Sequence, residues 1–190
     1  MEAYNKKIIN INKDPLTNQL NGSNSSSLKK YQSKVLGNEQ FTTLIKYELT
    51  TLLSGNLPGA LGYLFRKILY PYLFKNVGSG AIFGKGIVLR HPQHITLKNR
   101  VAIDDYVLLD ASGAGEEGIT LAEDIIISRN CVIQGKTGSV WIGKKTNIGC
   151  NTIITSGAGI FIGNSVLIGG NCYIGGGRYI SDRIDIPMME

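Results

Sequence analysis

The sequence predicts an all-β solenoid over residues 77–190, preceded by a short α-helical region over residues 41–76. A period of six residues runs from Val77 onward, with a large apolar residue at the start of each hexad. Glycine is also unevenly placed, because residues 1–76 contain 5 glycines and residues 77–190 contain 19. Many tight corners require such a concentration. The length of 190 residues fits one domain with an appendage.

The distribution of charge argues against a nucleic-acid-binding protein. Residues 1–76 have 10 Lys and Arg against 4 Asp and Glu, whereas residues 77–190 have 10 against 10. A nucleic-acid binder should place its positive charge on the folded recognition surface, so we expect no nucleic-acid partner. The sequence has no apolar run of membrane-spanning length, and its N-terminus lacks the apolar core of a secretory signal. We therefore expect a cytoplasmic protein.

The first segment, residues 1–40, is polar. Its stretch Asn21-Gly-Ser-Asn-Ser-Ser-Ser27 has the composition of a flexible linker. Such a stretch buries too little apolar surface to offset the entropy of ordering it. We expect this segment to be unstructured.

Residues 41–74 are predicted to form two amphipathic helices. Apolar residues recur at helical spacing from Phe41 to Leu53, the sequence Asn56-Leu-Pro-Gly59 breaks the run, and a second apolar face extends from Leu61 to Pro71. One interpretation is a helical cap over the open end of the next domain. The other is a membrane-surface anchor, in which basic residues face anionic lipid. These basic residues are Lys46, Arg66, Lys67 and Lys75.

The hexads predict the geometry of the solenoid. Six residues form one short strand and a corner, and three corners close a triangle, so we expect the leading side chains to point inward and to stack between coils. Coils that begin at residues 77, 97, 121, 142 and 162 give about five turns. The leading positions are Val77, Phe83, Leu89, Leu97, Ile103, Leu109, Leu121, Ile127, Ile133, Ile142, Ile148, Ile154, Ile162, Ile168 and Ile174.

Insertions follow the third hexad of each coil, so one edge of the predicted prism collects the loops. Loops on a rigid scaffold usually hold the functional residues, and we expect any site to lie there. Coils rise by roughly 4.8 Å each, which places the first and fifth coils on the order of 19 Å apart, too far to act on one reacting atom. The polar residues on this edge are His91, His94, Asp110, Glu116, Glu117 and Arg178.

The cysteines fit a reducing compartment, because their number is odd. Cys131 and Cys172 occupy equivalent corners two coils apart, about 10 Å, which exceeds the reach of a disulfide. We expect both to be small buried hydrophobic residues rather than nucleophiles.

The strings IGKKTNIGCNTI and IGNSVLIGGNCYIG resemble those of the hexapeptide-repeat acyltransferases. The resemblance covers residues 77–190 and implies a left-handed parallel β-helix of about five hexapeptide coils. It also implies acetyl-CoA or another acyl-CoA as co-substrate, transfer to a hydroxyl of a saccharide or similar small molecule, and a homotrimer. In this family a His acts as general base while backbone amides stabilise the oxyanion.

The resemblance also indicates candidate site residues. His91 is one of two histidines, and a corner His that bonds a neighbouring loop is the alternative interpretation of it. The segment 175–187 resembles the family loop that contains the catalytic His, but it has no His here. Arg178 and Asp182 are the candidates in that segment, with Arg183 and Asp185 nearby. Two histidines are too few for the three-His metal site of the related γ-class carbonic anhydrases, so we expect no metal.

Two functions therefore remain open. The first is an acyl-CoA-dependent O-acyltransferase. The second is a catalytically incomplete β-helix scaffold that docks to a membrane surface, or to a partner protein, through residues 41–74. Relatives continue beyond this loop into further coils, whereas this chain ends at Glu190, which favours a shortened or incomplete member. The intact hexads do not discriminate between the two.

Overall fold

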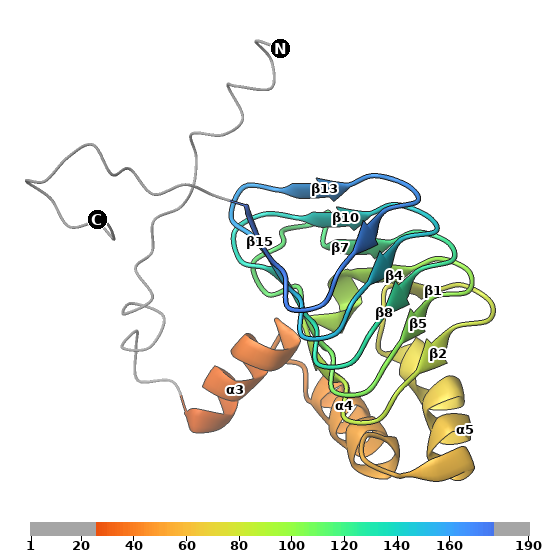
Figure 1. Cartoon of the computed structure of the whole chain (residues 1–190). Helices are drawn as coiled ribbons and strands as arrows, with labels where there is room; N and C mark the ends of the chain where they lie inside the picture. Colours follow the sequence, from red (N-terminus) through yellow and green to blue (C-terminus); the bar gives the residue numbers. More distant parts are fainter. Residues whose placement is uncertain (1–25, 177–190) are drawn as a thin grey trace, which may run out of the picture.

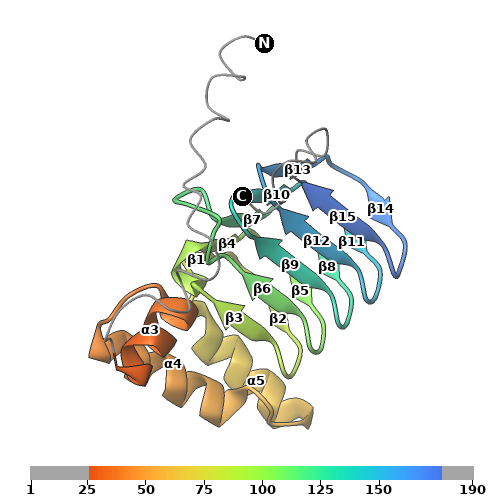
Figure 2. The ribbon, with the colours of Figure 1, turned by 90° about the vertical axis from the view of Figure 1, so that its left-hand side faces the viewer.

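A computed structural model describes residues 26–176 and confirms the predicted fold class. The chain forms a parallel β-solenoid of about five coils, and three α-helices precede the strands (Figure 1). The helices cover the end of the solenoid at which the first coil lies (Figure 2). Within residues 26–176, no helix has the length and apolar character that a membrane crossing requires.

The strands form three parallel sheets, with one strand from each coil in each sheet. The first sheet, sheet A, contains β1 (Asn76–Val77), β4 (Ile95–Leu97), β7 (Ile119–Leu121), β10 (Val140–Ile142) and β13 (Ile160–Ile162). Sheet B contains β2 (Ile82–Phe83), β5 (Ala102–Ile103), β8 (Ile126–Ile127), β11 (Asn147–Ile148) and β14 (Leu167–Ile168). Sheet C contains β3 (Val88–Arg90), β6 (Leu108–Asp110), β9 (Val132–Gly135), β12 (Ile153–Ser156) and β15 (Tyr173–Gly176).

The strand registers confirm the predicted inward columns. In sheet B, Ile127 pairs with Ile103 on one side and with Ile148 on the other. Sheets A and C align their leading residues in the same way. Most of the leading side chains are buried, because each coil covers the apolar face of the next. The hexapeptide interpretation of the sequence is therefore correct at the level of individual residues.

The corners of the prism depend on backbone conformations that the hexad repeats. A residue with positive φ lies three positions before the inward residue of each strand in sheets B and C. Asn130 and Asn151 adopt this conformation, which asparagine tolerates better than most residues, and their side-chain amides hydrogen-bond at 3.2 Å. Close contact between coils also requires glycine at some positions, because a Cβ on Gly143 would lie 2.5 Å from the carbonyl oxygen of Gly163.

The two predicted amphipathic helices are confirmed. They are α4 (Phe41–Ser54) and α5 (Gly59–Leu69), and a short 3-10 helix, η1 (Tyr70–Tyr72), follows. Tyr70 is fully buried after α5 and packs edge-to-face on Phe83, with ring centroids 5.4 Å apart. Phe74 contacts the same ring. This aromatic cluster closes the apolar interior at the first coil, as the helical-cap interpretation requires.

One expectation is wrong in part. Residues 27–36, which the polar composition predicted to be unstructured, form the helix α3 (Ser27–Leu36). The Ser26 side chain caps its N-terminus by accepting a hydrogen bond from the Lys29 amide, and Gly37 ends it with a φ of 71°. Leu36 is buried against the solenoid, so tertiary packing overrides the unfavourable composition of this helix.

Candidate functional site

The loops of the solenoid lie on one edge, between the end of sheet C and the start of sheet A. The first coil turns there through the 3-10 helix η2 (Pro92–His94), and the next coils turn through residues 111–118, 136–139 and 157–159. This arrangement confirms the predicted loop edge. Among the candidate residues within 26–176, it brings His91, His94 and Asp110 to the same edge.

Asp110 is a buried charged side chain of this edge, with 1% of its surface exposed. Its carboxylate accepts hydrogen bonds from the Ser112 amide at 3.0 Å and from Gln134 Nε2 at 3.1 Å. Arg90 lies 3.6 Å from the same carboxylate. Arg90, Asp110 and Gln134 are register partners in adjacent strands, so the sheet itself places them together. A buried carboxylate requires such partners, and this one fixes the start of the 111–118 loop.

His91 lies at the same edge but faces helix α3. Its backbone adopts a left-handed conformation with φ of 47°, and its amide donates to the Val35 carbonyl at 2.8 Å. Its Nε2 lies 2.9 Å from the Ser33 carbonyl oxygen and donates to it in the neutral ring. The Nδ1 side packs on Gly37, where an added Cβ would lie only 2.6 Å from Nδ1. Both ring nitrogens therefore contact the end of α3.

Burial lowers the pKa of His91 below its ordinary value, although the Ser33 carbonyl and the Asp110 carboxylate partly oppose this shift. The imidazole is therefore neutral at neutral pH. In this position His91 holds α3 against the first coil, as in the alternative interpretation of a corner His that bonds a neighbouring segment.

His94 ends η2 and is half-buried. Within residues 26–176, its ring makes no hydrogen bond to another side chain or to the backbone. The loop of the second coil lies directly beside it, because a Cβ on Gly118 would come within 1.8 Å of the His94 carbonyl oxygen. In that loop Glu117 accepts a hydrogen bond from Ser139 of the third coil at 2.9 Å. The edge thus places His94 next to the loop that contains Glu116 and Glu117.

The remaining candidates, Arg178 and Asp182, lie outside the described residues, as do Arg183 and Asp185. Their roles stay predictions. The cysteines are free, and Cys131 is buried with its thiol donating to the Gly149 carbonyl at 3.1 Å. Burial raises the pKa of the Cys131 thiol, which disfavours the nucleophilic thiolate. Within residues 26–176, no group of three or more His, Cys, Asp or Glu side chains is placed to hold a metal ion.

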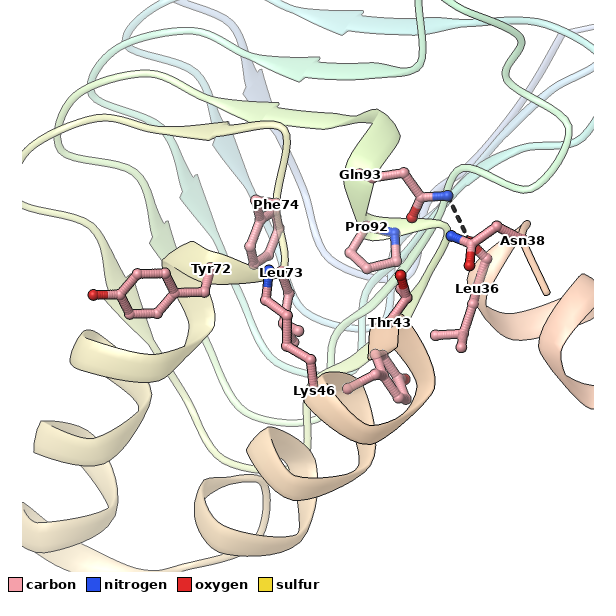
Figure 3. A pocket seen from close by; sticks show the side chains of 10 residues that line it. Leu36, Asn38, Thr43, Lys46, Tyr72, Leu73, Phe74, Pro92 and Gln93 are labelled. Carbon is pink, nitrogen blue, oxygen red and sulfur yellow. Dashed lines mark hydrogen bonds between the residues drawn. The ribbon is translucent and has the colours of Figure 1, made fainter. Parts of the chain in front are cut away.

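The sequence did not predict a small cavity between the helical cap and the first coil. Its volume is about 230 Å³, and Figure 3 shows the side chains around it. Asn38, Thr43, Lys46 and Gln93 supply polar groups, while Leu36, Leu73, Phe74 and Pro92 supply an apolar wall. The Gln93 amide donates to the Leu36 carbonyl, which ties η2 to α3 at the rim. No periodic pattern marks these residues, because the cavity arises from the packing of helices on the coil.

No protein-family model matches the chain. No curated protein is similar to it in sequence. Among solved structures, the chain is similar to serine acetyltransferase isoform 3 from Entamoeba histolytica, solved in complex with cysteine. The match has 12% sequence identity and a TM-score of 0.26, and it covers 90% of this chain and 59% of that chain. The chain thus spans about three fifths of the length of that protein.

Proposed function

We propose that this protein is an acyl-CoA-dependent O-acyltransferase of the hexapeptide-repeat type, acting on a hydroxyl of a saccharide or similar small molecule. The observation that supports it is the loop edge, where a rigid solenoid presents the His94 imidazole beside the acidic loop of residues 111–118. An imidazole titrates close to neutral pH and suits the removal of a hydroxyl proton. The saccharide acceptor rests on the family resemblance of the repeat.

In the proposed reaction, His94 takes the proton of the acceptor hydroxyl as the oxygen attacks the thioester carbonyl. The tetrahedral intermediate then expels the coenzyme A thiolate, which receives the proton from the imidazolium. The products are an ester and free coenzyme A, so atoms and charge balance. We assign the base to His94 ahead of His91, because the His91 ring is occupied by the Ser33 carbonyl and by Gly37.

Arg178 and Asp182 are proposed to contribute from the segment that follows β15, by binding the substrate. The fifth coil ends at β15, four coils along the axis from His94 in the first coil. Because β15 ends that far along the axis from His94, we propose for Arg178 and Asp182 a role in binding a distant part of a long substrate such as an acyl-CoA. They are binding candidates rather than partners of His94 in proton transfer.

A homotrimer is proposed as the working assembly. Its support is the outer row of sheet C, which is apolar in every coil and suits packing against another subunit. The row consists of Val88, Leu108, Val132, Ile153 and Tyr173, and Tyr173 is 70% exposed. Light scattering coupled to size exclusion should give about three times the chain mass of 20.6 kDa. A monomer would contradict this assembly.

The enzymatic proposal is tested by thiol release from acetyl-CoA and longer acyl-CoA thioesters with a panel of sugars. We expect release that depends on the acceptor, and a rate 10²- to 10⁴-fold lower for His94→Asn, the usual range for loss of a general base. Lys98→Ala, an exposed residue in a corner away from the loop edge, is the control and should keep the rate. Loss of rate in His91→Asn alone would assign the base to His91. Absence of both turnover and coenzyme A binding would contradict the enzymatic function.

The second candidate function is a catalytically incomplete scaffold. The occupied ring of His91 favours it, because this candidate base serves to hold α3 in place. A scaffold should fold and assemble normally, yet fail to bind coenzyme A in equilibrium dialysis. Measurable binding of coenzyme A at micromolar concentration would exclude this candidate.

A further inference from the structure

Helix α4 presents its apolar face to solvent. The side that packs on the protein is formed by Leu44, Tyr47, Thr50 and Ser54, and Tyr47 donates to the Leu89 carbonyl at 2.8 Å. The opposite side is formed by larger apolar residues. They are Phe41 (66% exposed), Ile45 (43%), Leu49 (51%), Leu52 (81%) and Leu53 (59%). The apolar face of α4 is therefore directed away from the solenoid.

Helix α5 likewise directs its apolar face to solvent, and it buries a charged residue against the first coil. Arg66 is only 4% exposed and donates to the backbone carbonyls of Phe83, Ser54 and Leu57 at 2.8–3.0 Å. Those contacts fix which side of α5 faces the first coil. The apolar side is left outward, with Leu61 (66% exposed), Leu64 (48%), Phe65 (43%) and Ile68 (52%).

The two apolar faces lie at the same end of the molecule. Both helices cover the first coil, and Figures 1 and 2 place them together below β1–β3, at the end opposite β13 and β14. Because each helix packs its other side on that coil, both apolar faces look away from the solenoid. We name the nine outward side chains of α4 and α5 the cap face. These nine exposed apolar side chains are grouped on two neighbouring helices, whereas exposed apolar residues of an ordinary soluble surface are scattered singly.

Charge identifies the kind of partner that fits the cap face. Residues 26–76 contain seven Lys and Arg against two Asp and Glu, whereas residues 77–176 contain eight against seven. Both acids of the helical region are engaged, Glu39 with Lys29 at 3.2 Å and Glu48 with the Tyr31 hydroxyl. Lys46 and Lys67 are exposed on the helices that form the cap face. A second copy of this positive end would be repelled, whereas an anionic surface would be attracted.

We propose that the cap face docks the protein onto an anionic lipid bilayer. The outward side chains of α4 and α5 enter the headgroup region, and the exposed Lys67 and Lys75 face lipid phosphates. Helices of 14 and 11 residues lie in the plane of the surface rather than cross it. The solenoid then stands above the bilayer on its first coil. This docking is independent of whether the loop edge is catalytic.

Vesicle flotation of the full chain tests the proposal. We expect recovery with phosphatidylcholine vesicles that contain phosphatidylglycerol, much weaker recovery with phosphatidylcholine alone, and loss of binding as salt screens the lysines. Lys67→Glu with Lys75→Glu should weaken binding by on the order of fivefold or more for each charge. Lys144→Glu with Lys145→Glu, on the solenoid, is the matched control and should leave binding unchanged.

A second pair of variants tests the apolar contacts. Leu52→Ser with Leu61→Ser should reduce vesicle recovery at least tenfold, since both side chains would leave the bilayer. The control is Phe161→Ser with Leu167→Ser, because these solenoid residues are about as exposed, at 74% and 79%, and lie outside the apolar row of sheet C. Circular dichroism checks that both double variants keep the fold.

Three results would overturn the proposal. The first is equal recovery of the cap and control variants. The second is equal recovery with anionic and with neutral vesicles, or no recovery with either. The third is a wild-type oligomer that Leu52→Ser with Leu61→Ser dissociates without lipid, which would assign the cap face to contact between copies of the chain.

Discussion

The helical cap and the solenoid use apolar residues in opposite ways. In the solenoid, Ile127 and Ile148 point inward and are fully buried. In the cap, Leu52 is 81% exposed while Arg66 is 4% exposed. The comparison shows that a repeat determines its own interior, because each coil is the partner of the next. A lone amphipathic helix has no such constraint, and its apolar side faces whichever partner covers it.

The largest expected effect is the difference in lost stability between a substitution inside the solenoid and one on the cap face. Ile148→Ala should lower the free energy of unfolding by about 3 kcal/mol, because the two neighbouring coils cannot collapse into the cavity it leaves. Leu52→Ala should change it by less than about 0.5 kcal/mol, since that side chain is already in solvent. Urea unfolding measures both. Equal losses would mean that the cap face is packed inside the protein.

A smaller effect tests whether the contacts of Arg66 determine that the apolar face of α5 points to solvent. Arg66→Met removes the donors to three backbone carbonyls and should destabilise the fold by about 2 kcal/mol. Lys67→Met, the exposed neighbour in the same helix, is the control and should be close to neutral. Thermal unfolding gives the comparison. If Arg66→Met is neutral as well, its contacts do not determine which side of α5 faces the coil.

The smallest effect concerns the junction of α3 with the first coil. Because burial lowers the pKa of His91, the state in which α3 packs on the first coil binds fewer protons than the state in which α3 has detached. Docking of α3 should therefore be strongest above the ordinary His pKa of about 6.5 and weaken as the pH falls below it. Amide exchange of residues 27–36 between pH 8 and pH 5 measures this. The pH dependence of α3 packing should vanish in His91→Asn and persist in His94→Asn. A pH dependence retained in His91→Asn would contradict the role given to His91.

The sequence predicts the solenoid in detail and the cap only in part. Residues such as Ile103 and Ile168 could be placed because a strict period leaves one register for each strand. The amphipathic runs of α4 and α5 were also visible, but their pattern does not say which side is covered. The cap and anchor interpretations were posed as alternatives, yet the helices cover the first coil and keep their apolar faces outward as well.

The candidate site was predictable in its place but not in its contacts. Insertions after every third hexad located the loop edge, and with it His94 and Asp110. The role of His91 depends on α3, a helix of unfavourable composition that forms through packing on the first coil. The cavity beside Lys46 arises from the same packing. Such tertiary contacts between segments of no shared period leave no local pattern in the sequence.

Hydrogen exchange of the full chain, with and without anionic vesicles, tests the contrast between the two regions most directly. We predict that vesicles slow amide exchange across α4 and α5 and leave the strands of the second to fifth coils unchanged. Slower exchange confined to the solenoid, or no change in either helix, would contradict the assignment of the cap face to a lipid surface.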